Sequence, residues 1–475
     1  MIRFLTLFTL ALAPLCALQA AAPAPRPNIL LLVADDLGYN DVGFQGGADI
    51  PTPNLDRLAA SGVRCTSGYV SYPVCSPSRA GFLTGRYQQR FGHEFNPRWQ
   101  TADGLPLSQA TIADAMRGAG YTTGMVGKWH LGSRPEYHPN RRGFGEFFGF
   151  LGGGHRYLPG SQVEVEVGAG KKAATREDAE HASPMLRNAV EEPEPPELTT
   201  KLGEEAAASI TRHARDAQPW FLYVAFNAPH TPLQARPDML EIFSHLADPR
   251  RRTYAAMVAT EDEAVGRVLA ALDATGQRER TLVFFFSDNG GPMTKRNANA
   301  SQNGLLRGQK GDVFEGGIRV PFVVSWPGRL PAGRTYAEPV ISLDVLPTAL
   351  AAAGATRDPK LPPLDGVDLV PFLTGKKSTS PHAQLFWRMD GGEAFAVREG
   401  NWKWLRTYQN PPELYDLSAD LGEKTNVAAR HPEIAARLAA ASAEWNRGLV
   451  APVFVNNPFG GFINLPGPPA KAAAP

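Results

Sequence analysis

Asn28-Ile-Leu-Leu-Leu-Val-Ala34, which runs directly into Asp35-Asp36-Leu37-Gly38, is the stretch that decides the fold. An unbroken apolar run that is closed by two carboxylates and a glycine is typical of a strand that is buried on both faces and ends in a loop. The pattern recurs at Pro219–Phe226 and at Thr281–Phe286, and the latter run is closed by Ser287-Asp288-Asn289-Gly290. Strands buried on both faces occur mainly in parallel sheets, so these runs predict such a sheet.

Helical periodicity separates the apolar runs. Apolar residues recur at helical spacing over 252–275, and a shorter helix is expected over 108–118. Further strands are expected over 122–126 and 321–325. Strands that alternate with helices predict an α/β fold, in which a large, mixed but mostly parallel sheet is sandwiched by helices.

The chain divides into unequal parts. A stretch rich in Pro and Gly around 355–380 indicates a boundary between a main α/β domain over 26–365 and a smaller domain over 380–450, in which we expect an antiparallel sheet and a helix. Residues 161–198 are rich in Lys, Glu, Ala and Pro and predict a surface excursion that cannot pack a core. The end of the chain, 465–475, is rich in Pro and Ala and is expected to be disordered.

Residues 1–22 are typical of a secretory signal peptide. Arg3 precedes an apolar run that ends at Leu18, and small residues at Ala20–Ala22 offer a cleavage site. The run is shorter than the roughly 20 apolar residues that a membrane span needs. Cys16 leaves a lipid anchor open as an alternative, but simple export fits better. We therefore expect a periplasmic or secreted protein without stable membrane insertion.

The composition is that of a soluble globular protein, with 43% hydrophobic and 20% charged residues. Lys plus Arg number 48 against 47 for Asp plus Glu, which gives no electrostatic argument for binding nucleic acid or an anionic membrane. An anionic ligand would have to be held by charges gathered locally.

Polar side chains follow three of the buried runs. Asp35 and Asp36 follow the first, His230 the second, and Asp288 and Asn289 the third. Ligands of open α/β sheets bind beyond the carboxyl ends of the strands. Donors that are all oxygen favour calcium or magnesium over zinc or copper. The alternative is that Asp and Asn at strand ends are only caps and turn residues, which is less convincing for two pairs on separate strands.

Cys75-Ser-Pro-Ser-Arg79, with Leu83-Thr-Gly-Arg86 after it, is the strongest local signal. It closely resembles the C/S-x-P-x-R signature of type I sulfatases, an arylsulfatase-like family of the alkaline-phosphatase superfamily. The resemblance implies that a separate maturation enzyme oxidises Cys75 to formylglycine (3-oxoalanine), whose hydrated aldehyde is the nucleophile. The less favoured alternatives are that Cys75 pairs with Cys65 in a disulfide or is a buried, inert thiol.

Further motifs resemble the same family, in family order, over roughly 27–450. They are Asn28–Asp36, Gly127-Lys-Trp-His-Leu-Gly132, Asn227-Ala-Pro-His-Thr-Pro232, Ser287-Asp-Asn-Gly290, Leu306-Arg-Gly-Gln-Lys-Gly311 and Glu315-Gly-Gly-Ile-Arg-Val-Pro321. The resemblance implies an alkaline-phosphatase-like fold and one calcium ion per chain. The metal ligands that it implies are Asp35, Asp36, Cys75, Asp288 and Asn289. The catalytic residues that it implies are Cys75, Arg79, Lys128, His130, His230 and Lys310.

The resemblance also implies a role for each of these side chains in the hydrolysis of a sulfate monoester. Arg79 would anchor the formylglycine hydrate, while Lys128 and Lys310 would neutralise the sulfate. His230 or Lys310 would protonate the leaving oxygen, and His130 would take a proton from the second hydroxyl so that sulfate is expelled. If the segment after Gly127 is extended, Lys128 and His130 project to the same face.

The prediction of the substrate depends on weaker sequence signals. His155 and Arg156, in the loop 151–157, and the tryptophans at 387 and 402–404 are candidates for binding a sugar, because aromatic side chains suit stacking on a sugar ring. Packing in the core is an equally good interpretation of these residues. An exported enzyme that acts on a sulfated carbohydrate is expected. The alternatives are a phosphate or phosphonate monoester hydrolase of the same superfamily and a secreted glycan-binding protein without catalysis.

Overall fold

In the computed structural model, which describes residues 26–159, 183–294 and 298–455, a ten-stranded sheet forms the centre. Strand β1 (Asn28–Ala34) lies in the middle, and all of its residues are buried. It pairs in parallel with β8 (Trp220–Ala225) on one side and with β9 (Thr281–Ser287) on the other, and β4 (Thr122–Lys128) pairs in parallel with β8. The carboxyl ends of these four strands therefore meet at one edge of the sheet.

Shorter strands extend the sheet on both sides. Outward from β9 they are β10 (Phe322–Ser325), β2 (Val63–Cys65) and β11 (Arg334–Tyr336), and outward from β4 they are β5 (Glu146–Phe150), β6 (Met185–Arg187) and β7 (Val190–Glu192). Strand β10 is antiparallel to both of its neighbours, and β6 is antiparallel to β5 and β7. A separate two-stranded ladder joins β3 (Gly68–Tyr69) to β12 (Val340–Ile341).

The prediction of a surface excursion over 161–198 is wrong for the second half of that range. Strands β6 and β7 lie within that range and form an edge of the main sheet. Met185 and Leu186 of β6 are buried against the sheet, whereas β7 is a short edge strand that is mostly exposed. The first half of the range, to residue 182, lies outside the described residues.

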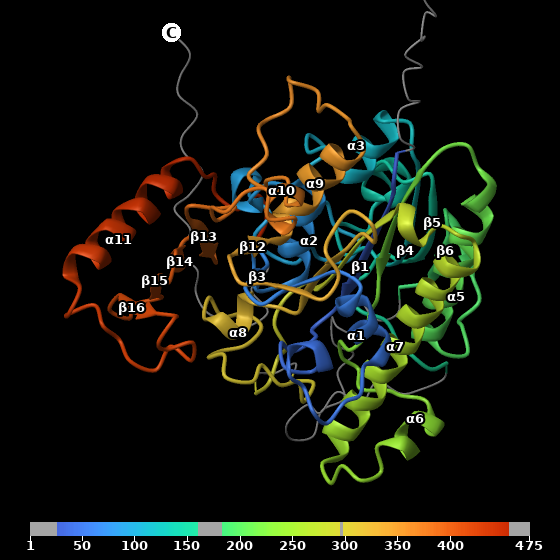
Figure 1. The fold of residues 1–475 in the computed structure, drawn as a ribbon, viewed down its shortest axis with the longest axis horizontal. Coiled ribbons are helices and arrows are strands. Elements are labelled where there is room, and N and C mark those ends of the chain that lie inside the picture. Colours follow the sequence, from blue (N-terminus) through green and yellow to red (C-terminus); the bar gives the residue numbers. More distant parts are fainter. Residues whose placement is uncertain (1–25, 160–182, 295–297, 456–475) are drawn as a thin grey trace, which may run out of the picture.

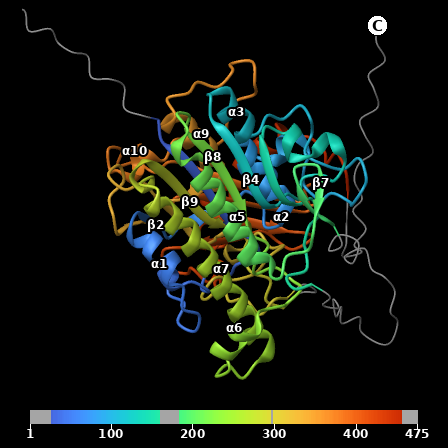
Figure 2. The same ribbon diagram turned by 90° about the vertical axis from the view of Figure 1, so that its right-hand side faces the viewer.

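Helices cover both faces of the sheet (Figures 1 and 2). One layer contains α1 (Pro53–Ala60), α5 (Leu198–Arg212), α6 (Pro237–Ile242) and α7 (Pro249–Ala274). The other contains α2 (Cys75–Thr84), α3 (Ile112–Gly118), α9 (Val345–Ala352) and α10 (Val370–Leu373). Because strand side chains alternate, β1 contributes Leu30 and Leu32 to the first layer and Leu31 and Val33 to the second.

Local capping sets the ends of the two predicted helices. The helix expected from residue 108 begins only at Ile112, because Thr111 accepts a hydrogen bond from the Asp114 backbone N–H and the Asp114 carboxylate accepts one from Thr111. The helix expected from residue 252 begins earlier, at Pro249, where Asp248 caps it and proline suits the first turn.

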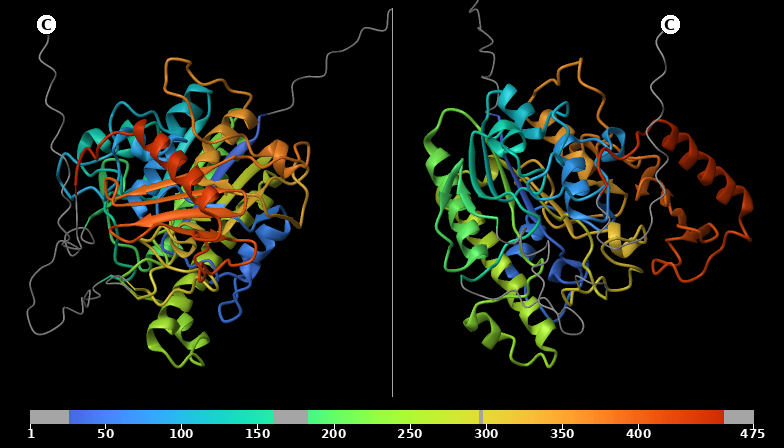
Figure 3. Two further views of the ribbon diagram at one scale, coloured as in Figure 1. Left: turned by 90° about the vertical axis from the view of Figure 1, so that its left-hand side faces the viewer. Right: turned by 180° about the vertical axis from the view of Figure 1, so that it is seen from behind.

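The C-terminal part forms a second, smaller sheet (Figure 3). Its antiparallel strands are β13 (Leu385–Met389), β14 (Ala394–Glu399), β15 (Trp402–Thr407) and β16 (Glu413–Asp416), and α11 (Pro432–Arg447) covers its outer face. The inner face packs on the main body, with Trp387 and Leu405 beside Tyr69. The predicted fold class is confirmed: a mostly parallel sheet between helices, and a small antiparallel sheet with a helix.

Three predictions about segments and boundaries remain. The signal peptide over 1–22 and the tail over 465–475 lie outside the described residues, and the domain boundaries stay predictions. Within the described part of the chain, none of the helices combines the length and apolar character needed to cross a membrane.

Candidate active site

Carboxylates from two distant parts of the chain gather where β1 and β9 end. Asp35, Asp36 and Asp288 are completely buried, as is Asn289. The Asp288 backbone N–H donates to the Ala34 carbonyl at 3.0 Å, which fixes the two strand ends side by side. Asn289 Nδ2 donates to Asp36 Oδ1 at 2.7 Å. The side chains that were predicted as oxygen ligands therefore lie close together in the structure.

Cys75 lies beside this cluster, in the first turn of α2. It is buried, and its Sγ lies 3.4 Å from Asp35 Oδ1 and 3.2 Å from Lys310 Nζ. Burial, and then the Asp35 carboxylate, raises the pKa of the thiol, so Cys75 is protonated at neutral pH. Cys65 is a second buried, free thiol, so the disulfide alternative does not hold.

Three cationic side chains are each paired with one of the three carboxylates. The pairs are Lys128 with Asp35, Lys310 with Asp36 at 2.7 Å, and Arg79 with Asp288 at 2.8 Å. The segment that carries Lys310 is tied to its neighbours because the Gly311 N–H donates to the Pro73 carbonyl at 2.8 Å. The site is therefore nearly neutral, although all of its charges except that of the partly exposed Lys310 are completely buried.

The close packing of the carboxylates shifts the pKa values of two of them. Burial opposes the charge on Asp35, but Lys128 and the other cations around it hold its pKa well below the ordinary value. Burial and the Asp35 carboxylate raise the pKa of Asp288 to about 7. The negative charge on one carboxylate thus disfavours ionisation of its neighbour. A bound cation would offset this repulsion between the carboxylates.

The residues fit a bound cation. Asp35, Asp36, Cys75 and His230 each have a ligand-type atom within 4.8 Å of the others, and all four residues are buried. Asn289 Oδ1 is buried without a hydrogen-bond partner in the described part of the chain. An orphaned amide oxygen beside carboxylates suits a hard divalent cation such as calcium.

Arg79 lies at the base of the site and is completely buried. Besides its pair with Asp288, Nη1 donates to the Lys128 carbonyl at 3.2 Å and to the Tyr223 hydroxyl at 3.0 Å. Arg79 therefore joins β9, β4 and β8 beneath Cys75. Tyr223, in the middle of a buried strand, was not predicted as part of the site, because its ring alone explains its place in the sequence pattern.

His230 follows β8 and reaches the cluster. Its Nδ1 lies 2.6 Å from the Thr231 carbonyl oxygen, an acceptor, so Nδ1 carries the proton and Nε2 faces Asp36 Oδ2 at 3.6 Å. Burial lowers the pKa of His230 to about 4, although Asp35 and Asp36 oppose this shift. The Tyr157 hydroxyl lies 2.8 Å from the His230 carbonyl oxygen and helps to position this segment.

The backbone that carries His130 into the site is not the extended segment that was expected. Strand β4 ends at Lys128, and His130 has a φ of 59°, so the two side chains do not alternate along one strand. Gly127 allows β4 to approach β8 closely, since a Cβ there would lie 1.9 Å from the Ala225 carbonyl oxygen. Both ring nitrogens of His130 are buried without a partner among the described residues. Burial, and then Lys128, lowers its pKa well below the ordinary value.

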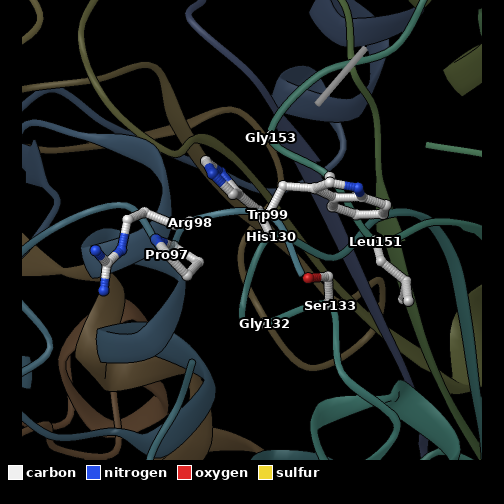
Figure 4. A pocket seen from close by; sticks show the side chains of 9 residues that line it. Pro97, Arg98, Trp99, His130, Gly132, Ser133, Leu151 and Gly153 are labelled. Carbon is white, nitrogen blue, oxygen red and sulfur yellow. The ribbon is translucent and has the colours of Figure 1, made fainter. Parts of the chain in front are cut away.

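The loop predicted to bind a sugar contributes Leu151, Gly152 and Gly153 to a pocket beside His130, whereas His155 and Arg156 are not among the residues that line it. His155 packs on Phe150 and faces Glu194 at 3.5 Å, and Arg156 follows it in the same loop, so their role stays a prediction. Trp387 and Trp404 are buried in the C-terminal part, which favours the packing interpretation. The pocket beside His130 also contains the half-buried Trp99 (Figure 4).

Comparison with known proteins agrees with this geometry. The Sulfatase family matches residues 27–355, and the family N-sulphoglucosamine sulphohydrolase, C-terminal, matches residues 309–444. Arylsulfatase A of Bos taurus is 37% identical over 467 residues, which cover 90% of this chain and 88% of the relative. N-acetylgalactosamine-6-sulfatase of Mus musculus is 35% identical over 435 residues, with 88% and 79% covered.

A solved structure extends the likeness to three dimensions. The crystal structure of Ps i-CgsB in complex with k-i-k-neocarrahexaose has a TM-score of 0.83 and 36% sequence identity, and covers 91% of this chain and 95% of its own. The match spans both the main sheet and the C-terminal part. The chain belongs to the sulfatase family, whose members are sulfuric ester hydrolases.

Proposed function

We propose that the protein hydrolyses sulfate monoesters of a carbohydrate, with Cys75 converted to formylglycine and with one calcium ion held by Asp35, Asp36, Asp288 and Asn289. The observation that carries the proposal is the position of the Cys75 sulfur. It contacts both a carboxylate of the candidate cation site and the ammonium group of a lysine, in a buried cluster. A reactive group at this position would face a bound cation and a bound anion together.

The charges of the site explain why a cation is needed. Three carboxylates already occupy the three cationic side chains, so the site as it stands offers no excess positive charge to a sulfate ester. Formylglycine would supply the nucleophilic hydroxyl of its hydrate, and bound calcium would supply a Lewis acid. With the carboxylates turned to a cation, Lys128 and Lys310 would be available to bind the sulfate oxygens.

The other side chains fit roles in proton transfer and positioning. Arg79, fixed by Asp288 and Tyr223, would hold residue 75 in place. His130 is neutral and, within the described part of the chain, neither of its ring nitrogens has a hydrogen-bond partner, so it would accept a proton from the second hydroxyl of the hydrate. His230 or Lys310 would donate a proton to the leaving oxygen, because a bound anion would favour the protonated form of either residue.

The carbohydrate and the export of the protein are supported indirectly. One relative is named an N-acetylgalactosamine-6-sulfatase, and the similar structure was solved with a neocarrahexaose bound. A sulfated carbohydrate is therefore the proposed substrate. The N-terminal sequence supports export to the periplasm or the medium, with a formylglycine-generating enzyme as a transient partner before the chain matures.

Two measurements test the proposal. Mass spectrometry of the peptide that carries Cys75 should show that sulfur has been exchanged for oxygen with the loss of two hydrogen atoms. The purified protein should hydrolyse 4-nitrophenyl sulfate far faster than 4-nitrophenyl phosphate. Faster phosphate hydrolysis would favour the phosphate or phosphonate monoester hydrolase, and no turnover by a protein with converted Cys75 would favour the glycan-binding alternative.

Removal of divalent cations is expected to lower both activity and stability. A ligand at about 100 times its Kd stabilises the folded state by about 2.7 kcal/mol, and here its loss also leaves the carboxylates of Asp35, Asp36 and Asp288 facing one another. Thermal unfolding in EGTA should therefore begin at a lower temperature, and calcium should restore both properties. An unfolding temperature that does not respond to calcium would contradict a calcium site here.

Replacement of His130 by alanine is expected to lower kcat by about 10²–10⁴-fold, as is usual for loss of one acid–base group. His138→Ala is the control, because His138 is a nearby histidine that packs on Phe147 and does not reach the carboxylates. Steady-state kinetics with 4-nitrophenyl sulfate measures the effect. Equal activities of the two variants would remove His130 from the reaction.

A further inference from the structure

The first turn of α2, which carries Cys75, receives no hydrogen bond from the side chain of its N-cap residue, Val74. The backbone N–H groups of a first turn have no acceptor within the helix, so another part of the chain has to supply one where the turn is buried. The Ser76 N–H donates to Asn96 Oδ1 at 3.2 Å, and Ser76 Oγ lies 2.8 Å from His93 Nε2. The residue next to Cys75 is therefore held at two points by a single loop.

His93 is a neutral ring that contacts two parts of the chain. Its side chain is completely buried, and this burial lowers its pKa to about 3, so the ring carries no charge at neutral pH. The ring of Phe454 meets the imidazole edge to face, with the ring centroids 5.0 Å apart and the planes at 90°. His93 is thus held by Ser76 at Nε2 and by an aromatic contact with the C-terminal part of the chain.

Phe454 belongs to a short segment after α11, 449–454, which we call the C-terminal strap. Two of its backbone N–H groups donate to the carbonyls of Gln89, at 3.2 Å, and of Gly92, at 2.9 Å. Gly92 has a φ of 74°, and a Cβ there would lie 2.6 Å from a carbonyl oxygen of the strap, so glycine permits the close approach. The strap therefore lies beside the residues that immediately precede His93.

A buried ion pair joins the same loop to the C-terminal sheet. Arg388, in β13, pairs with Glu94, and both residues are buried. The Arg388 guanidinium also donates to the Val450 carbonyl of the strap at 2.6 Å and to Asn446 Oδ1 of α11 at 2.9 Å. Contacts with the C-terminal part of the chain thus fix the loop that holds the first turn of α2.

We propose that His93 is a positioning residue for the nucleophile, and that Phe454 and the C-terminal strap hold His93 in place. The inference rests on the proposed function, in which the first residue of α2 carries the nucleophile. His93 acts through Ser76 rather than on the substrate itself. The groups proposed to bind sulfate, Lys128 and Lys310, belong to other segments. Displacement of the first turn of α2 therefore lowers the rate of the reaction more than it weakens binding of the ester.

The first test compares two replacements of His93. His93→Leu keeps a buried side chain but loses the hydrogen bond to Ser76, whereas the amide of His93→Gln can take the place of Nε2. His138→Leu is the matched control, because the His138 ring also meets a phenylalanine, Phe147, edge to face, with the centroids 5.2 Å apart. Steady-state kinetics use 4-nitrophenyl sulfate, and kcat is expressed per converted residue 75, as counted by mass spectrometry.

His93→Leu should lower kcat by about 10- to 100-fold and change KM by less than about threefold, since small displacements of a reacting group have effects of this size. His93→Gln should restore most of kcat. The double variant with Ser76→Ala should be little slower than His93→Leu alone, because the two residues act as one unit. Three results would each overturn the inference: an unchanged kcat in His93→Leu, an equal loss in His138→Leu, or fully additive effects of the His93 and Ser76 substitutions.

Phe454→Ala tests the strap, and it decides the question if His93→Leu does not fold. Loss of the aromatic contact with His93 should lower kcat by about 2- to 10-fold, again with little change in KM. Val453→Ala is the control, because this side chain lies in the same strap but is 58% exposed. Equal kcat values for these two variants would overturn the inference. A wild-type protein with converted residue 75 that fails to hydrolyse the ester would overturn the proposed function, and the inference with it.

Discussion

Replacement of Cys75 by alanine is expected to lower turnover of a sulfate ester by at least about 10⁴-fold, because removal of a nucleophile leaves only binding and electrostatic stabilisation. The fold should not change, since alanine fits the first turn of α2 and removes a neutral thiol. Calcium should still bind, because Asp35, Asp36 and Asp288 are unaltered. The expected result is a folded, calcium-binding and inactive protein.

The second buried thiol provides the control. Cys65→Ala removes the same atoms from a completely buried position in β2, away from the carboxylates. We expect a loss of stability in this variant but normal kcat with 4-nitrophenyl sulfate. Kinetics, thermal unfolding with and without calcium, and mass spectrometry of residue 75 separate the effects. Substantial activity in Cys75→Ala would contradict its role as the source of the nucleophile.

The central sheet could be predicted because its signal is local. The runs that form β1, β8 and β9 are continuously apolar and end in loops, so each strand can be recognised from a few consecutive residues. Strands such as β2 and β6 are only three residues long, and their existence depends on which neighbour offers a free edge. No pattern within so short a segment carries that information.

The residues of the candidate site also divide into those that the sequence predicts and those that only the fold reveals. Asp35, Cys75 and Lys310 could be predicted because they stand in motifs that resemble those of a family, and the structure brings them together. Tyr223 was missed because a tyrosine in a buried strand is explained by its ring, and only the fold reveals that its hydroxyl meets a guanidinium. Trp99 was missed because its loop contains no motif, and its neighbours in the pocket come from distant segments.

A buried network of charges connects the C-terminal sheet to the active-site side of the main body. Lys403, in β15, lies 2.9 Å from Glu315 Oε1 and 2.8 Å from Glu423 Oε1, and all three residues are completely buried. Glu315 begins α8 (Glu315–Ile318), five positions after Lys310, and its N–H donates to Glu423 Oε2 at 2.7 Å. Tyr69 donates to Glu315 as well, at 2.6 Å. The network therefore anchors the segment that carries Lys310.

Replacement of Lys403 by methionine is expected to lower the free energy of unfolding by about 3–5 kcal/mol, because it leaves the buried Glu423 without its cation and leaves Glu315 with Arg319 alone as its paired cation. Methionine keeps most of the length and volume of the side chain, so the effect reports charge rather than a cavity. Lys201→Met is the matched control. Lys201 pairs with Glu205 at 2.9 Å, but its side chain is 35% exposed, and such a surface pair contributes about 0.2–1 kcal/mol.

The dependence on pH distinguishes loss of charge pairing from loss of packing. Burial raises the pKa of Glu423 to about 7, even though Lys403 opposes the shift. At about pH 5 the Glu423 carboxyl is thus already neutral in the folded protein, and Lys403→Met leaves less unpaired charge than at about pH 8, where Glu423 is ionised. The destabilisation measured by urea unfolding should therefore be larger at the higher pH. A loss that is the same at both pH values, or no larger than that of Lys201→Met, would mean that packing rather than this lysine holds the two glutamates in place.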